Sequence, residues 1–297
     1  MSEEMSQVGR VDQTTRPDQF IRLLDDASDL DCVKAAKHLS LALLKLEPGL
    51  RVLEVGCGTR DDTRALAEKV LPNGEVVAID KSQAMIDEAK KRSKGQWTNI
   101  DFRVGDVTSL AFDSNSFDRC HTERTLIHLS DPQQAVQEMI RVLRSGGLLL
   151  AFEGDLDTNV LNSSETEVTR RILRFWCDSF QYPHVGRRLP ALFKKGELLN
   201  IHVQPHTFIF DFNVTEQVLI AGTLERAIEA GVVTLDEAGR WLSDLKRARD
   251  SGTFFSLVQD FLSRDARRDR MTGWLISLSL RPKPGANPLQ VAERMAN

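Results

Sequence analysis

The amino-acid sequence predicts an α/β fold in which a parallel β-sheet carries helices on both faces. Three observations predict it: strand-like and helix-like segments alternate over the first half of the chain, short turns separate them, and the composition is that of an ordinary globular protein. The chain has 297 residues, of which 41% are hydrophobic and 28% are charged. This size fits one large domain, or one domain with an insertion.

The alternation follows an N-terminal helical segment. Apolar residues recur at helical spacing between residues 19 and 46, which predicts one or two helices there. The predicted strands that follow cover residues 51–56, 75–80, 100–106, 117–123 and 146–155. The predicted helices between them cover residues 61–71, 82–93 and 131–145. Ser82 is the expected N-cap of the second helix, and Pro132 takes the first position of the third.

The pattern changes after residue 160. It predicts helices at 164–180 and 186–200, a strand at 201–212, almost wholly helical structure at 214–263, and a final strand at 271–283. We therefore expect four regions. They are an N-terminal helical segment at 1–46, a core at 47–212, a helical lid insertion at 213–270, and a final strand with the tail at 271–297. An insertion between the last two strands of such a sheet often covers a ligand crevice.

The composition argues against several classes of protein. The formal net charge is −4, which does not indicate a nucleic-acid-binding surface. The longest apolar runs, such as 146–152, are too short to span a bilayer, and the N-terminus lacks the apolar core of a signal peptide. The cysteines are widely spaced, so neither a disulfide framework nor a metal site is expected. We expect a cytoplasmic monomer or homodimer with no nucleic-acid or membrane partner.

Polar residues and glycines fall at the ends of successive predicted strands. Gly56 and Gly58 follow the first strand, where a missing side chain lets a ligand approach the backbone. Asp80 ends the second strand, where a carboxylate can accept both hydroxyl groups of a ribose, and Asp106 ends the third. Because ligands bind outside the carboxyl ends of parallel strands, this register predicts a nucleoside-containing ligand at that edge of the sheet.

Residues 48–155 resemble class I S-adenosylmethionine-dependent methyltransferases of the group that includes the ubiquinone/menaquinone methyltransferases. "VLEVGCGTR" is similar to that family's first motif, and "VVAIDKSQAMIDEAKKR" to its second. The resemblance implies a Rossmann-like seven-stranded sheet with helices on both faces, N-terminal helices, and a helical lid between the last two strands. It also implies an enzyme that uses S-adenosyl-L-methionine to methylate a small-molecule acceptor.

The resemblance also implies which residues bind the cofactor. Residues of the first turn surround its methionine part, Asp80 binds its ribose, Asp106 binds its adenine, and the backbone near Thr122 meets its amino-acid end. The implied cofactor-binding residues are Glu54, Gly56, Cys57, Gly58, Thr59, Asp80, Lys81, Met85, Gly105, Asp106, Val107, Thr122 and Glu123.

The sequence departs from the family pattern at Arg60, where the family usually has glycine. A dinucleotide-binding turn requires its third glycine at the next position, which is Asp61, so the sequence fits that class less well. Two interpretations of Arg60 remain open. It is a solvated surface residue, or its guanidinium reaches the cofactor and changes the affinity.

Methyl transfer from a sulfonium is an in-line displacement, so alignment of the acceptor supplies most of the catalysis. A general base is required only if the acceptor must lose a proton. The candidates near the expected crevice are His128, His184 and Glu123, with His121 and Asp155 as further acid–base groups. For each histidine, a structural hydrogen bond is the simpler role.

The apolar residues of the predicted lid favour a small, partly hydrophobic acceptor, because some of them could line a pocket. An RNA or protein methyltransferase is a second hypothesis, which the lack of a basic surface disfavours. A third is a protein of the same fold that binds S-adenosylmethionine in a non-methylating, cyclase-like or regulatory role.

Overall fold

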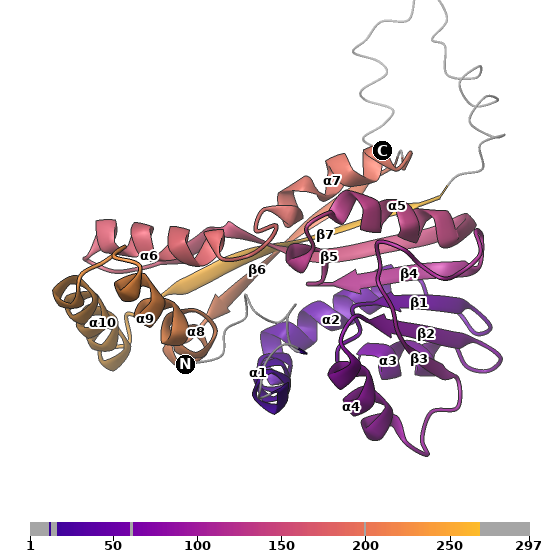
Figure 1. Cartoon of the computed structure of the whole chain (residues 1–297), viewed down its shortest axis with the longest axis horizontal. Helices are drawn as coiled ribbons and strands as arrows, with labels where there is room; N and C mark the ends of the chain where they lie inside the picture. The colour runs from indigo at the N-terminus through magenta and orange to yellow at the C-terminus, as the bar shows by residue number, and fades with distance from the viewer. Residues whose placement is uncertain (1–11, 13–16, 60–61, 199, 268–297) are drawn as a thin grey trace, which may run out of the picture. The chain divides into compact units, whose positions relative to one another are not determined.

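The computed structural model describes residues 12, 17–59, 62–198 and 200–267, in which seven strands form one sheet (Figure 1). The strand order is β3-β2-β1-β4-β5-β7-β6. The strands are β1 (Arg51–Val55), β2 (Glu75–Asp80), β3 (Ile100–Val104), β4 (Phe117–Glu123), β5 (Leu143–Leu161), β6 (His202–Phe210) and β7 (Ser256–Ala266). β1 to β5 are parallel, whereas β7 runs antiparallel to both β5 and β6.

The order of the strands reverses between β1 and β4. The chain runs outward from β1 through β2 to β3, and then returns to place β4 on the other side of β1. The helices that follow diverge at this point, which leaves a crevice at the carboxyl ends of the two strands. The predicted α/β class and the seven-stranded sheet are confirmed.

The predicted helices are present with small shifts of their ends. Before and between the first five strands they are α1 (Pro17–Asp29), α2 (Asp31–Leu43), α3 (Asp62–Lys69), α4 (Gln83–Ser93), the short 3₁₀ helix η2 (Leu126–His128) and α5 (Pro132–Val142). The Ser82 hydroxyl accepts a hydrogen bond from the backbone N–H of Met85, which confirms it as the N-cap of α4. Pro132 begins α5 directly after Asp131, whose carboxylate accepts from Gln134.

Helices cover both faces of the sheet, and alternate residues of β5 supply both hydrophobic cores. Leu149 and Ala151 pack with α5, α6 (Thr166–Asp178) and α7 (Val185–Lys195). Leu150 and Phe152 pack on the opposite face with α2 and α3. Burial on both faces explains why this strand is a continuous apolar run in the sequence.

A helical insertion separates the last two described strands, but it ends at Asp250, whereas the predicted range of 213–270 also takes in β7. It contains α8 (Phe212–Thr215), the π-helix η3 (Glu216–Ile220), α9 (Ala221–Glu229) and α10 (Leu235–Asp250). These helices gather beside α6 (Figure 1), and the Trp241 indole N–H donates to the Thr169 hydroxyl at 2.9 Å. A capping box of Thr234 and Glu237 begins α10.

The prediction of helix for residues 256–263 was wrong, because this segment belongs to β7. Buried and half-buried residues alternate along the strand, and it pairs with β5 on one side and β6 on the other. The spacing of its apolar residues fits either a helix or a strand, and only pairing with strands distant in the sequence decides between the two. The predicted strand at 271–283 lies outside the described residues. Within the described ranges, no helix combines the length and apolar character needed to cross a membrane.

Candidate active site

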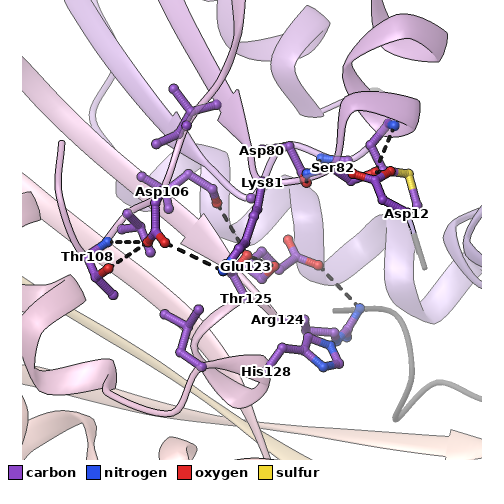
Figure 2. A pocket seen from close by; sticks show the side chains of 18 of the residues that line it. Asp12, Asp80, Lys81, Ser82, Asp106, Thr108, Glu123, Arg124, Thr125 and His128 are labelled. Carbon is purple, nitrogen blue, oxygen red and sulfur yellow. Dashed lines mark hydrogen bonds and ion pairs between the residues drawn. The ribbon is translucent and has the colours of Figure 1, made fainter. Parts of the chain in front are cut away.

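A cavity of about 390 Å³ lies at the carboxyl ends of β1, β2 and β4 (Figure 2). This volume is within the range of roughly 300–1,000 Å³ that is common for small-molecule sites. Asp12 and Leu24 reach its wall from the N-terminal side of the chain. The predicted site residues that line it are Gly56, Gly58, Asp80, Lys81, Met85, Gly105, Asp106, Val107, Glu123 and His128.

The turn after β1 requires glycine for two reasons. Gly56 and Gly58 have φ angles of +70° and +51°, in the left-handed region that favours glycine. A Cβ atom on Gly56 would also lie 2.0 Å from Oγ1 of Thr125. The backbone N–H groups of Gly56 and Cys57 both donate to the Ile79 carbonyl, at 2.8 and 3.0 Å, which ties the turn to β2.

The Asp80 carboxylate is held at the cavity wall by two backbone groups. Its Oδ2 accepts from the Gly58 N–H at 2.8 Å, and its Oδ1 accepts from the Ser82 N–H at 2.9 Å. These bonds fix the orientation of the carboxylate between the glycine turn and α4. A carboxylate held here can accept hydrogen bonds from the hydroxyl groups of a ligand.

Asp106 forms a second acidic position on the wall. Figure 2 shows Thr108 and Lys81 converging on its carboxylate. The Thr108 hydroxyl donates at 2.7 Å and the Thr108 N–H at 2.9 Å, while the Lys81 ammonium lies 3.5 Å away. The Thr108 hydroxyl bond is the main reason that the pKa of Asp106 lies below its usual value, although partial burial opposes it.

The wall of the cavity is acidic overall. Among its described residues, the carboxylates of Asp12, Asp80, Asp106 and Glu123 face two cationic side chains, Lys81 and Arg124. Such a wall favours a ligand that carries positive charge and disfavours a ligand with a phosphate group.

The structure places some predicted residues away from the cavity. Cys57, Thr59 and Thr122 are buried and do not line it, so their roles in binding remain predictions. Glu54 also lies behind the wall, where its Oε2 is 2.7 Å from Nδ1 of His121.

The other ring nitrogen of His121, Nε2, lies 2.8 Å from the Ser40 hydroxyl of α2. Ser40, His121 and Glu54 are all at most 3% exposed. Burial disfavours the charged imidazolium, but the Glu54 carboxylate outweighs it and raises the pKa of His121 to about 8. His121 thus connects α2 to β1 and is not placed to act on an acceptor in the cavity.

The candidate bases separate into two groups. His128 and Glu123 line the cavity, and the His128 ring lies 5.8 Å from that of Phe180. His184 does not line it. Its Nδ1 is 4.0 Å from Oδ1 of Asp155. The Asp155 carboxylate also pairs with Arg187 of α7, so it serves the packing of that helix and is not a base in the cavity.

Several wall residues were not among the predicted site residues, and Thr125 and Arg124 are two of them. Thr125 packs against Gly56, as described above, and donates to the Val55 carbonyl at 3.3 Å. Arg124 has a φ angle of +50°, unusual for arginine, and its Nη2 lies 3.0 Å from Oδ2 of Asp260. The only sequence signal was their position directly after a strand end. The contact with Asp260 spans 136 positions and leaves no local pattern.

Arg60 and Asp61 lie outside the described residues, so neither interpretation of Arg60 is decided. No group of three or more His, Cys, Asp or Glu side chains in the described part of the chain is arranged to hold a metal ion.

Comparison with known proteins identifies the family. A family model described as a methyltransferase domain matches residues 46–200, which is more than half of the chain. The chain belongs to this methyltransferase family. It is also 34% identical over 253 residues to an uncharacterized 37.1 kDa protein in transposon TN4556 of Streptomyces fradiae, covering 84% of this chain and 72% of that protein.

Other similarities are shorter or structural. The demethylmenaquinone methyltransferase of Staphylococcus carnosus is 36% identical over 110 residues, which cover 37% of this chain and 45% of that protein. The YcgJ protein of Bacillus subtilis has a TM-score of 0.57 at 20% identity, over 80% of this chain and 99% of that one.

Phosphoethanolamine N-methyltransferase 2 of Haemonchus contortus, solved with phosphomonomethylethanolamine and S-adenosylhomocysteine, has a TM-score of 0.57 at 17% identity. The match covers 87% of this chain and 59% of that one. At these identities the two structures show a shared fold. The predicted family, fold and methyltransferase class are confirmed.

Proposed function

We propose that this protein transfers the methyl group of S-adenosylmethionine to a small, partly hydrophobic acceptor by in-line displacement. The observation that carries the proposal is the acidic cavity at the reversal of strand order, with the glycine turn of β1 and the Asp80 carboxylate on its wall. The fold of the family supports it.

The residues present fit this cofactor. The cofactor carries a positive sulfonium and an ammonium group, which suit a wall where carboxylates outnumber cations. A dinucleotide would bring two phosphates into the same acidic cavity. Gly56 leaves room for the Thr125 side chain beside the turn, because a Cβ at this position would overlap it.

Each part of the wall has a role in this proposal. Asp80 accepts the ribose hydroxyls, Asp106 accepts from the adenine amino group, and the apolar side chains of Ile79 and Met85 contact the adenine ring. The backbone of the glycine turn meets the amino-acid end. The cofactor supplies an electrophilic methyl group on a positively charged sulfur.

The remaining wall faces the acceptor in this proposal. Arg124, Thr125 and His128 follow β4, and Leu24 approaches from α1. The Gln217 amide of the insertion donates to the Asp26 carboxylate of α1 at 2.9 Å, so the insertion contacts α1. No described residue of the insertion lines the cavity, so the expectation that its apolar side chains form the acceptor pocket was wrong. In this proposal the wall residues that follow β4 hold a small acceptor in line. Glu123 or His128 takes the proton when the acceptor must lose one.

The comparisons support a small-molecule acceptor. The curated relatives include demethylmenaquinone methyltransferases, whose acceptor is a small molecule by name.

The proposal is tested with S-adenosylmethionine labelled in its methyl group. The purified protein is incubated with a small-molecule extract, and separately with total RNA and with protein. We expect label in the small-molecule fraction and its loss in Asp80→Ala. Label in RNA or protein alone would contradict the proposed acceptor class, and cofactor binding without any transfer would favour the non-methylating alternative.

A further inference from the structure

Glu153 of β5 is fully buried and binds three consecutive backbone groups. Its Oε1 accepts from the N–H groups of Thr125 and Leu126 at 3.0 and 2.8 Å. Its Oε2 accepts from the N–H of Ile127 at 3.3 Å. These residues form the turn between β4 and α5, and Glu153 itself does not line the cavity.

That turn carries part of the cavity wall. At the start of the turn, Thr125 packs against Gly56. At the end of the turn, His128 lines the cavity (Figure 2). Leu126 and Ile127 are buried in the hydrophobic core between them. The position of these backbone groups therefore sets both the glycine turn and the acceptor side of the cavity.

Charged groups surround Glu153 on the elements packed near it. Gly186 of α7 packs so closely that a Cβ on it would lie 2.8 Å from the Glu153 carbonyl oxygen. The charged and titratable side chains on the neighbouring segments are Glu123, Arg124, His128, Asp155, His184, Arg187 and Asp260. Asp260 opposes ionisation of Glu153, whereas Arg124 is attracted to its carboxylate.

Burial has the largest influence on the pKa of this carboxyl group. It raises the pKa of Glu153 from 4.5 to about 7, although the three N–H bonds oppose the shift. A carboxyl group with a raised folded-state pKa stabilises the fold below its unfolded pKa of 4.5, and this contribution is lost as the pH rises through 7. Ionised Glu153 therefore lowers the stability of the folded protein at pH 8. An apolar residue would avoid that loss but would leave the three N–H groups without this acceptor.

We propose that ionised Glu153 is a positioning residue that holds the 125–128 turn in place for cofactor binding and methyl transfer. Three acceptor bonds need both carboxylate oxygens, and a protonated carboxyl offers a donor at one of them. Protonation therefore releases part of the turn. The role of Glu153 in methyl transfer rests on the proposed function, whereas its hydrogen bonding to the turn does not.

The test measures hydrogen exchange of the Thr125, Leu126 and Ile127 amides, calorimetric affinity for S-adenosylhomocysteine, and the thermal midpoint. Glu153→Gln keeps the side-chain volume but turns an NH₂ group toward the backbone donors. At pH 8 we expect protection of these amides and cofactor affinity each to fall about tenfold, as for loss of a hydrogen bond to a charged group. The midpoint should be unchanged or higher.

Asp265→Asn is the matched control. Asp265 is also a buried carboxylate on a strand, and it accepts from the Asn200 N–H at 2.6 Å. It pairs with Leu149 of β5 and does not line the cavity. Its replacement should lower the midpoint without changing cofactor affinity. A purely structural Glu153 would behave like this control, with a lower midpoint and unchanged affinity, and that result would overturn the proposal.

The wild-type chain allows a second test, which does not require the variant to fold. Protection of the three amides, corrected for intrinsic exchange, should fall as the pH is lowered from 8 to 6, and protection of the β1 amides should not. Equal protection at both values would overturn the proposal. If the wild type binds no S-adenosylhomocysteine, the proposed function fails, while the exchange result still decides whether Glu153 holds the turn.

Discussion

Two buried carboxyl groups, on β5 and β7, and two carboxyl groups of the helical insertion have pKa values shifted in opposite directions. Burial raises the pKa values of Glu153 and Asp260, beside the cavity. In the insertion, a hydrogen bond from Arg171 is the main reason that the pKa of Glu237 falls to about 2, and one from Ser163 does the same for Asp244. The two buried groups thus oppose folding near neutral pH, whereas those of the insertion favour it.

The backbone shows the same difference. At the cavity, positive φ angles occur at Gly56, where a Cβ would collide with Thr125, and at Arg124, which is not glycine. In the insertion, Gly231 ends α9 with a φ of +69°, and a Cβ on it would meet nothing within 4 Å. Gly56 and Arg124 therefore place unfavourable backbone at the cavity wall, as is common at functional sites.

The largest effect is expected for Gly56→Ala. The new Cβ overlaps Thr125 and strains a positive φ, so affinity for S-adenosylhomocysteine should fall by about a hundredfold, corresponding to about 2.7 kcal/mol. Gly95→Ala is the control, because Gly95 has a φ of +77° with nothing within 4 Å. Calorimetry should find unchanged affinity for the control. Equal losses in both variants would show that backbone strain alone matters.

A smaller effect is expected for Asp80→Asn. The amide keeps the shape of the side chain but cannot accept at both ends, so the bonds to Gly58 and to the ribose weaken. Affinity for S-adenosylhomocysteine should fall by about tenfold, as for loss of one hydrogen bond to a charged group. Asp101→Asn on β3, an exposed residue paired with Arg103, should have no effect. An unchanged affinity in Asp80→Asn would remove the ribose contact from the proposal.

The smallest effect is expected in the insertion, for Asp244→Asn. The carboxylate accepts from the Ser163 hydroxyl at 2.7 Å and the Ser164 N–H at 2.8 Å. Because its folded pKa of about 2 lies below the unfolded value of 3.8, its stabilisation is present above pH 4 and is lost as the pH falls through 2. The variant should lose at most about 1 kcal/mol at pH 6. Thermal unfolding from pH 2 to pH 7 measures it, and a difference independent of pH would refute the assignment.

The sequence predicted the parts of the site that follow directly from a strand end. Gly56, Gly58, Asp80 and Asp106 each lie at or shortly after the end of a recognisable strand, and the parallel register brings them together. The contacts of Glu153 with the 125–127 turn could not be predicted, because they join residues that share no local pattern.

Strand β7 was missed for a similar reason. Its apolar residues suit a helix or a strand equally, and pairing with β5 and β6 decides the outcome. His121 and Glu54 illustrate the same limit. Both lie on strands that end at the predicted site. Only the packing of α2 shows that Ser40 hydrogen-bonds His121, so that His121 and Glu54 form a buried contact and not a catalytic pair.

The decisive measurement is a calorimetric titration of the wild-type chain with S-adenosylmethionine, S-adenosylhomocysteine and NAD in parallel. An acidic cavity with a glycine turn predicts that both adenosyl compounds bind, with one molecule per chain, and that NAD does not. Binding of NAD in place of the adenosyl compounds, or no binding of either of them, would contradict the assignment of this cavity as the cofactor site.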